Sequence, residues 1–240
     1  MNLLVLGASS VIGSEIAVAF ARGNWLLLVG RDPQRLGDTA VRCRNAGAER
    51  TLELPCDLAT GIAEVARVAL EWGVTVVVNA ASATSRLRDN QIPIERLQEY
   101  FSVEVSAPLE LVRTVATGSK DPVRVIYISS ILAVLPTPNR RIYGSLKGIH
   151  ERALSALTAS TPRLRSQIFR VATIVNPDVR TAKAQSLGCE VKRAFEAERT
   201  VVTYGLAGRL LWAVYATQPL LGHLLIRGSR LVRKRGTSDD

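Results

Sequence analysis

Short apolar runs alternate with longer segments of helical periodicity, and this alternation constrains the fold more than any other feature of the chain. The apolar runs are Leu3–Leu6, Trp25–Val29, Leu52–Leu54, Val74–Val78, Val123–Ile128 and Gln167–Val175. They are rich in Val, Ile and Leu without polar alternation, as in parallel strands that helices cover on both faces. The helical segments lie near 12–22, 33–46, 61–72, 95–117 and 141–160. This order predicts an α/β protein with a doubly wound parallel sheet.

The rest of the chain predicts a shorter helix near 188–198 and a strand at Val201–Tyr204. No Pro-, Gly- or Ser-rich linker divides the 240 residues, so we expect a single domain over residues 1–205. Residues 206–240 are an extension, apolar from Leu210 to Ile226 and then basic. Pro219 interrupts the apolar stretch, which is shorter than the ~20 residues of a spanning helix. We expect this extension to pack on the domain or on an anionic membrane surface.

Charge and cysteine content exclude several classes of function. The formal net charge is +10, but the basic residues are mostly dispersed, which argues against a nucleic-acid-binding surface. Cys43, Cys56 and Cys189 form no C-x-x-C pair, so we expect neither a disulfide framework nor a metal site. The N-terminus runs directly into the first strand, unlike a signal peptide. These features indicate the cytoplasm, with peripheral contact at the inner face of a membrane as an alternative.

The first predicted strand ends in a glycine-rich turn, Gly7-Ala8-Ser9-Ser10-Val11-Ile12-Gly13. Glycines let the backbone turn tightly beside a ligand, and a helix that begins inside the segment favours negative charge at its N-terminus. Ligands of doubly wound sheets bind beyond the carboxyl ends of the strands, where this turn lies. We therefore expect Gly7, Ser9, Ser10, Ile12 and Gly13 to hold the pyrophosphate of a dinucleotide.

The second strand ends in Gly30-Arg31-Asp32, which bears on the choice of dinucleotide. A carboxylate at the tip of this strand would bind the ribose 2′-hydroxyl of NAD. Here the tip is a glycine followed by an arginine, and a guanidinium suits a 2′-phosphate through paired hydrogen bonds. The sequence therefore favours NADP(H), with Arg31 bound to the 2′-phosphate, while Asp32 leaves NAD(H) as the alternative.

The most specific motif follows the fifth strand, which ends in Ser129-Ser130 and precedes Tyr143 and Lys147. A tyrosine and a lysine four residues apart lie on one face of a helix. A free phenol has a pKa of about 10, and a neighbouring ammonium favours the phenolate, which improves a phenol as an acid–base catalyst. We expect Tyr143 to exchange a proton with a substrate oxygen. Ser130, or Ser129 as the fallback, would hydrogen-bond the same oxygen.

In this order and spacing, the motifs resemble those of the short-chain dehydrogenase/reductase family. The glycine turn resembles the family's G-x-x-x-G-x-G, with Val11 in place of the middle glycine, and Tyr143 to Lys147 is its Y-x-x-x-K. The resemblance covers about residues 1–181. It implies a Rossmann-type domain that assembles as a homo-oligomer. It also implies that the domain transfers a hydride between NAD(P)H and a small-molecule ketone or secondary alcohol.

The resemblance also implies further cofactor contacts. Tyr143 and Lys147 would lie against the nicotinamide ribose, and Thr181 against the nicotinamide amide. The remaining contacts are Asp57 and Leu58 near the adenine, and Asn79 and Ala80 after the fourth strand. The C-terminal extension loosely resembles the ends of reductases that act on polyprenyl-phosphate-linked keto-sugars. Basic loop residues that could surround such an anionic substrate are Arg86, Arg88, Arg140, Arg141, Arg180 and Lys183.

One departure from the family pattern falls inside the predicted catalytic group. Glu104 stands where the family commonly has an asparagine that helps to hold a water in the proton relay from the lysine. Glu104 could replace that role, pair with Lys147 and alter its effect, or signal reduced activity. A nucleotide-binding regulatory protein with little turnover is therefore the alternative function, followed by an epimerase or dehydratase. His150 is predicted to be packed or exposed rather than catalytic.

Overall fold

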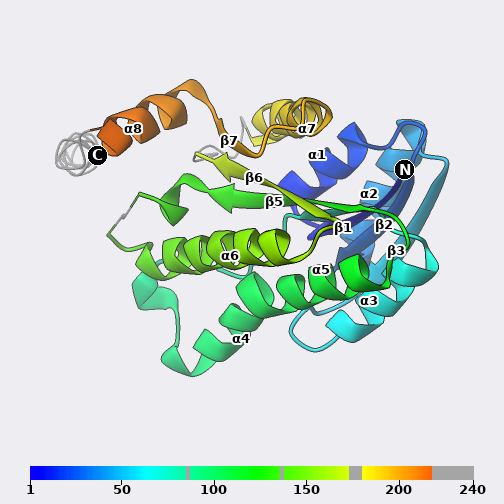
Figure 1. The fold of residues 1–240 in the computed structure, drawn as a ribbon, viewed down its shortest axis with the longest axis horizontal. Coiled ribbons are helices and arrows are strands. Elements are labelled where there is room, and N and C mark those ends of the chain that lie inside the picture. The colour runs from blue at the N-terminus through cyan, green and yellow to red at the C-terminus, as the bar shows by residue number, and fades with distance from the viewer. Residues whose placement is uncertain (85–86, 136–137, 173–179, 218–240) are drawn as a thin grey trace, which may run out of the picture.

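The computed structural model describes residues 1–84, 87–135, 138–172 and 180–217. Parallel strands form one seven-stranded sheet in the order β3-β2-β1-β4-β5-β6-β7 (Figure 1). The strands are β1 (Asn2–Leu6), β2 (Trp25–Gly30), β3 (Arg50–Pro55), β4 (Val76–Asn79), β5 (Val123–Ser130), β6 (Leu164–Val171) and β7 (Val201–Tyr204). The predicted α/β class and doubly wound parallel sheet are confirmed.

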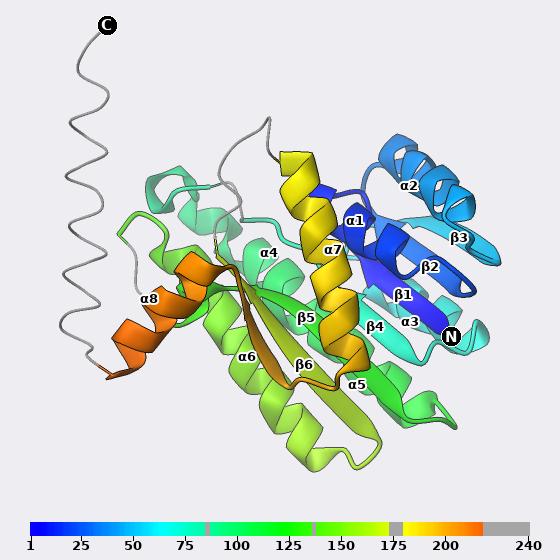
Figure 2. The same ribbon diagram turned by 90° about the horizontal axis from the view of Figure 1, so that it is seen from above.

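Helices cover both faces of the sheet, as the apolar strands require. Helices α1 (Val11–Ala19), α2 (Pro33–Asn45) and α7 (Arg180–Glu196) pack on one face, and α3 (Ile62–Glu71), α5 (Ala107–Gly118) and α6 (Arg141–Ser160) on the other (Figures 1 and 2). Successive side chains of a strand point to opposite faces. In β1, accordingly, Leu3 and Val5 enter the first core, and Leu4 and Leu6 enter the second.

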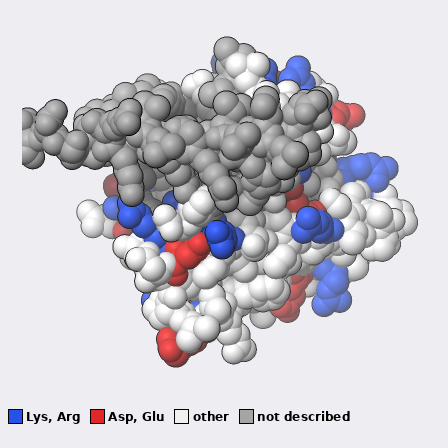
Figure 3. All heavy atoms as spheres, turned by 90° about the vertical axis from the view of Figure 1, so that its left-hand side faces the viewer, with Lys and Arg blue, Asp and Glu red and all other residues white. Residues whose placement is uncertain are grey.

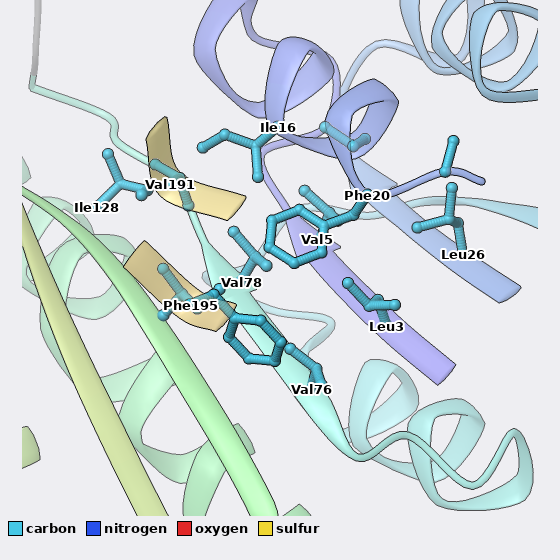
Figure 4. Packing of buried hydrophobic residues seen from close by; sticks show 14 of the residues in the cluster. Leu3, Val5, Ile16, Phe20, Leu26, Val76, Val78, Ile128, Val191 and Phe195 are labelled. Atoms are coloured by element: carbon cyan, nitrogen blue, oxygen red, sulfur yellow. The ribbon is translucent and has the colours of Figure 1, made fainter. Parts of the chain in front are cut away.

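The core between the sheet and the α1/α7 pair is built mainly from aliphatic side chains and phenylalanine rings (Figure 4). Phe20, which ends α1, and Phe195 of α7 meet edge to face, with ring centroids 5.4 Å apart and an interplanar angle of 76°. Both rings lie with Val5 and Val76 of the central strands in the same buried cluster. This packing fixes α1, whose N-terminus faces the carboxyl end of the sheet.

The strand order reverses between β1 and β4, so a crevice opens where these two neighbours end. Gly7, directly after β1, has a φ of 78°, a conformation that favours glycine. A Cβ at this position would lie 2.8 Å from the Ala81 Cα, beyond the end of β4. Gly7 is therefore required by both the turn and the close approach of the two chain segments.

The predicted helix over 95–117 is interrupted in the structure. A short helix α4 (Leu97–Phe101) leads into a π-helical turn (Ser102–Ser106), and α5 then begins at Ala107. Pro108 has no backbone N–H and cannot donate to the Glu104 carbonyl, which breaks the regular α-helical ladder at this point. Helix α7 begins at Arg180, eight residues before the predicted 188–198, and β6 begins at Leu164 rather than Gln167.

Helix α8 (Leu206–Thr217) follows β7 at the edge of the sheet (Figure 2). Arg209 Nε donates a hydrogen bond to the Thr203 carbonyl at 3.0 Å, and the Arg170 guanidinium lies 5.3 Å from the Trp212 ring. Within the described residues, no helix combines the length and the apolar character needed to cross a bilayer. The rest of the predicted extension, residues 218–240, lies outside the described residues.

Candidate active site

A pocket of about 510 Å³ lies at the carboxyl ends of β1, β2, β3 and β4. Its size falls in the range of small-molecule and cofactor sites. The lining residues come from the segments that follow these strands and from the π-helical turn: Gly7, Ser9, Ser10, Gly30, Arg31, Asp32, Arg35, Cys56, Asp57, Leu58, Ala80, Ala81, Ser82, Ala83, Leu87 and Val103. Residues far apart in the sequence thus meet where a doubly wound sheet binds its ligand.

Most of the predicted cofactor-binding residues line this pocket. They are Gly7, Ser9, Ser10, Arg31, Asp57, Leu58 and Ala80. Ile12, Gly13 and Asn79 are not among its described lining residues. Gly13 instead packs against the turn, because a Cβ there would lie 2.2 Å from the Gly7 oxygen, and the Asn79 side chain accepts a hydrogen bond from Ala81 N at 3.2 Å. Thr181 lies in the first turn of α7, and its side chain is outside what the structure describes.

The N-terminus of α1 is built to receive an anion. Ser10 caps the helix, and its hydroxyl oxygen accepts a hydrogen bond from Gly13 N at 3.0 Å. Ser9 and Ser10 both line the pocket, so the partial positive charge of the helix N-terminus meets it. No acidic side chain lies in the first turn of α1. The turn and the pocket therefore fit the pyrophosphate of a dinucleotide.

Asp32 and two arginines, Arg31 and Arg35, lie just after the tip of β2. Asp32 caps α2 by accepting a hydrogen bond from Arg35 N at 3.1 Å, and it also pairs with the Arg35 side chain at 3.4 Å. Arg31 and Arg35 both line the pocket. A Cβ at Gly30 would lie 2.5 Å from Ser9 Oγ, so a carboxylate at this tip would require Ser9 to move. Arg35, which sequence reasoning missed, follows the capping aspartate by three residues.

Two glycines bring the predicted catalytic helix against the end of β5. A Cβ at Gly144 would lie 2.5 Å from the Leu132 oxygen, and one at Gly148 would lie 3.0 Å from the Ala133 oxygen. Helix α6 therefore packs directly on the 3₁₀ turn Ile131–Ala133, which follows Ser130. This contact places Tyr143 and Lys147 beside the end of β5. The glycines, four residues apart next to Tyr143 and Lys147, are the signal that sequence reasoning missed.

Asp89 fixes the start of α6 from the loop after β4. Its two carboxylate oxygens accept hydrogen bonds from Arg141 N and Ile142 N, both at 3.0 Å. These amides would otherwise lack partners, because the first N–H groups of a helix have no carbonyl within it. The guanidinium of Arg140, just before the helix, lies 4.8 Å from the Tyr143 ring. A cation thus flanks the predicted proton donor on the side of the helix N-terminus.

The two serines at the end of β5 have different partners. Ser129 Oγ donates to the Glu151 carboxylate at 2.6 Å, and Glu151 forms a 2.7 Å ion pair with Arg170. Ser130 Oγ accepts a hydrogen bond from Leu132 N at 3.2 Å. A hydroxyl that accepts one hydrogen bond keeps its proton to donate elsewhere. The arrangement therefore favours Ser130 over Ser129 as the donor to a substrate oxygen.

Glu104 and Lys147 form a buried ion pair. Lys147 Nζ lies 3.2 Å from Glu104 Oε2, and the two residues are 2% and 1% exposed. Nζ also lies 3.5 Å from the Ala81 and Ile128 oxygens. Burial works against the charged form of each group, but mutual attraction outweighs it, raising the pKa of Lys147 and lowering that of Glu104. Of the three roles the sequence left open for Glu104, the structure shows the pairing with Lys147.

The second oxygen of Glu104 holds the loop after β4. Glu104 Oε1 accepts hydrogen bonds from Ser82 Oγ at 2.5 Å, Ala83 N at 2.9 Å, and Thr84 N and Oγ1 at 3.0 and 2.9 Å. Ser82 and Ala83 also line the nucleotide pocket. One carboxylate therefore joins the pocket wall to the ammonium of Lys147, a connection between segments that no local pattern indicates.

His150 is packed in the interior, one turn after Lys147 on α6. It is 1% exposed, and its ring stacks on Tyr127 with centroids 3.9 Å apart. Burial, and then the charge of Lys147, lower the pKa of His150 to about 4, so the imidazole is neutral near pH 7. Of the packed and the exposed states that the sequence left open for His150, the structure shows the packed one.

The outer surface shows no gathering of one charge sign on the side drawn in Figure 3. Over the described part of that face, basic and acidic side chains are interspersed among neutral ones. On the described part of that face, the cations are therefore individual side chains rather than a broad basic surface.

A family model for short chain dehydrogenases matches residues 1–190 of this chain. The protein belongs to this family, and it is an oxidoreductase that acts on CH–OH groups or the corresponding carbonyls with NAD(P). The predicted family and enzyme class are thus confirmed. No curated protein matches the chain.

Solved structures share the fold at low sequence identity. An alcohol dehydrogenase specific for bulky-bulky ketones from Comamonas testosteroni is 23% identical, with a TM-score of 0.77, over 92% of this chain and 93% of that one. A short-chain dehydrogenase from Sphingobium yanoikuyae, solved in complex with NADPH, is 24% identical, with a TM-score of 0.72, over 92% and 94%. An NAD⁺-bound xylitol dehydrogenase is 19% identical, with a TM-score of 0.67, over 76% and 74%.

Proposed function

We propose that this protein is an NADPH-dependent carbonyl reductase in which Tyr143 is the proton donor. The observation that carries the proposal is the contact of Gly144 and Gly148 with the turn after Ser130. It puts the tyrosine, the lysine and the serine at the end of β5, whose neighbour β4 leads into the nucleotide pocket. The reacting groups and the cofactor would then meet at one edge of the sheet.

Each side chain has a distinct task in this proposal. NADPH, when bound, supplies the hydride. Tyr143 Oη donates a proton to the substrate carbonyl oxygen, and Ser130 Oγ donates a hydrogen bond to the same oxygen as negative charge develops on it. Lys147 supplies positive charge near Tyr143, with Nζ 5.8 Å from the centroid of that ring, and would hydrogen-bond the nicotinamide ribose. Glu104 holds Lys147 in place.

Arg31 and Arg35 support NADP(H) over NAD(H), since both line the pocket while Asp32 is engaged as a helix cap. The Sphingobium yanoikuyae relative was solved with NADPH, whereas the xylitol dehydrogenase was solved with NAD⁺. The other proposed cofactor contacts are Gly7, Ser9, Ser10, Ile12 and Gly13 for the pyrophosphate, Asp57 and Leu58 for the adenine, Asn79 and Ala80 after β4, and Thr181 for the nicotinamide amide.

We further propose an anionic, bulky ketone as substrate. Arg140 lies against the ring of Tyr143 at 4.8 Å, where a guanidinium can bind a phosphate near the reacting carbonyl. The ketones named for the Comamonas testosteroni enzyme are bulky on both sides. A phosphate-linked keto-sugar on a lipid carrier, which the resemblance of the C-terminal extension suggests, combines both properties.

The proposal is tested by following NADPH oxidation with a bulky neutral ketone and with its phosphorylated counterpart. We expect turnover with both and a higher kcat/KM for the phosphorylated compound. Equal kcat/KM values would contradict the anionic substrate but leave the reductase standing. NADPH binding without turnover of any ketone in a broad panel would instead favour the regulatory protein, for which the pairing of Glu104 with Lys147 is the supporting observation.

Replacing Arg31 with serine is expected to weaken NADPH binding by roughly 10- to 100-fold, since a hydrogen bond to a charged group contributes about 1.5–3 kcal/mol. The Kd for NADH should not change, because it lacks the 2′-phosphate. Fluorescence titration with both nucleotides measures the two affinities. Arg44→Ser is the control, because Arg44 lies near the far end of α2 and contacts Thr51 and Glu53 rather than the pocket. An equal loss of NADPH and NADH affinity in Arg31→Ser would contradict the assignment.

The domain limits, the homo-oligomer and the location stay proposals from the sequence. We propose that residues 1–205 are the catalytic domain and that residues 206–240 pack on it or contact an anionic membrane from the cytoplasm. The hydrogen bond of Arg209 to Thr203 supports packing for the start of this extension.

A further inference from the structure

The π-helical turn Ser102–Ser106 leaves one buried carbonyl without its usual partner. In the turn, Ala107 N donates to the Ser102 oxygen, five residues back. The Glu104 carbonyl would accept from residue 108 in an α-helix, but Pro108 has no N–H. A buried backbone carbonyl needs another donor, because leaving it unpaired costs free energy. Since π-helical turns are frequent at functional sites, the group that satisfies this carbonyl is of interest.

His150 supplies the missing donor. Its Nδ1 lies 2.8 Å from the Glu104 oxygen, and since a carbonyl can only accept, Nδ1 carries the proton. The imidazole is buried and neutral, so this hydrogen bond also selects one tautomer. The Tyr127 ring, against which the imidazole stacks, also lies 5.0 Å from Lys147 Nζ. His150 is therefore held on two sides.

Glu104 is consequently fixed at both its backbone and its side chain. Its carbonyl is held by His150 of α6, and its carboxylate by Lys147 of the same helix and by the loop Ser82–Thr84. The position of the carboxylate relative to Lys147 thus depends on the register of the π-helical turn. The register itself depends on the group that donates a hydrogen bond to the Glu104 carbonyl.

We propose that His150 is a positioning residue for the reaction. By donating Nδ1–H to the Glu104 carbonyl, it holds the π-helical turn in the register that keeps the carboxylate on Lys147, one helical turn from Tyr143. The inference rests on the proposed reductase function. In this proposal, Glu104 on the turn and His150 on α6 together set the position of the Lys147 ammonium.

The test compares side chains of similar shape with and without a donor. His150→Asn keeps an N–H close to the position of Nδ1, whereas His150→Leu is nearly isosteric with asparagine but has no donor. His150→Phe lacks the donor but keeps a ring to stack on Tyr127. We expect kcat for ketone reduction to fall roughly 10-fold in the Leu and Phe variants, because small misplacements of catalytic groups are costly. The KM for NADPH should not change, and the Asn variant should recover most of kcat.

A second measurement needs no turnover. The ¹⁵Nζ resonance of the buried Lys147 ammonium, recorded without substrate, reports its pairing with Glu104. We expect wild type and His150→Asn to share one resonance position, and His150→Leu and His150→Phe to show a shifted or broadened signal. A Lys147 signal that is the same in all variants would overturn the inference, as would an Asn variant as slow as the Leu variant. The expected NMR series in a protein that reduces no ketone would refute the proposed function alone.

Discussion

Replacing Tyr143 with phenylalanine is expected to lower kcat for ketone reduction by about 10²–10⁴-fold, the usual contribution of general acid–base catalysis. The substitution removes the proposed proton donor and leaves the α6 packing face, formed by Gly144 and Gly148, unchanged. NADPH binding should persist, because Tyr143 does not line the nucleotide pocket among the described residues. Steady-state NADPH oxidation and fluorescence titration measure the two effects separately.

Tyr100→Phe is the matched control for this loss. Tyr100 is a phenol as well, 4% exposed, and it packs in α4 against Val105 and Leu146 of the neighbouring segments. Removing its hydroxyl should leave kcat unaltered. If Tyr143→Phe kept full activity, or if both variants lost the same activity, Tyr143 would not be the proton donor.

The fold was predictable because buried parallel strands have a strong local signature. Runs such as Trp25–Val29 and Val123–Ile128 are almost entirely apolar, and they form most of β2 and β5, which helices cover on each side. The tight turn at the end of β1 was equally predictable, because Gly7 has a positive φ and lies close to Ala81, and both favour glycine. Requirements that one residue imposes on its own backbone can be read from sequence.

The interior of the site was less predictable, because it depends on contacts between distant segments. Glu104 was recognised as a departure, and pairing with Lys147 was one of the three roles that the sequence left open. The choice among these roles depends on the turn that Pro108 creates. Arg35 lines the pocket in the first turn of α2, and this position could be foreseen only by knowing that Asp32 caps that helix. The early start of α7 at Arg180 was missed because Arg180 and Lys183 were expected in a loop and the resemblance placed Thr181 against the nicotinamide amide.

Glu104→Gln is expected to lower the free energy of unfolding by about 3–5 kcal/mol, as when one partner of a buried ion pair is removed. Glutamine can still accept the hydrogen bonds that Ser82 and Thr84 donate to Oε1. At the Oε2 position, however, it would place an N–H₂ group against the Lys147 ammonium, leaving that charge buried without a counter-charge. Urea denaturation at pH 7, followed by circular dichroism, measures the loss. Glu64→Gln is the control, because it breaks an exposed pair with Arg67, and such pairs contribute little.

The stability that the Glu104 carboxylate contributes depends on pH. The pKa of Glu104 is lower in the folded protein than the value of about 4.3 expected for an unfolded chain. The stability that its charge contributes is therefore fully present above that unfolded value and is lost as the pH falls through the lower folded value. The difference in unfolding free energy between wild type and Glu104→Gln should be widest near pH 7 and narrow below about pH 4.

Lys147→Met should also lower the free energy of unfolding, but in the double variant the two losses should not add, because both report one interaction. Additive losses, or a gap that does not change with pH, would mean that the ion pair does not stabilise the fold.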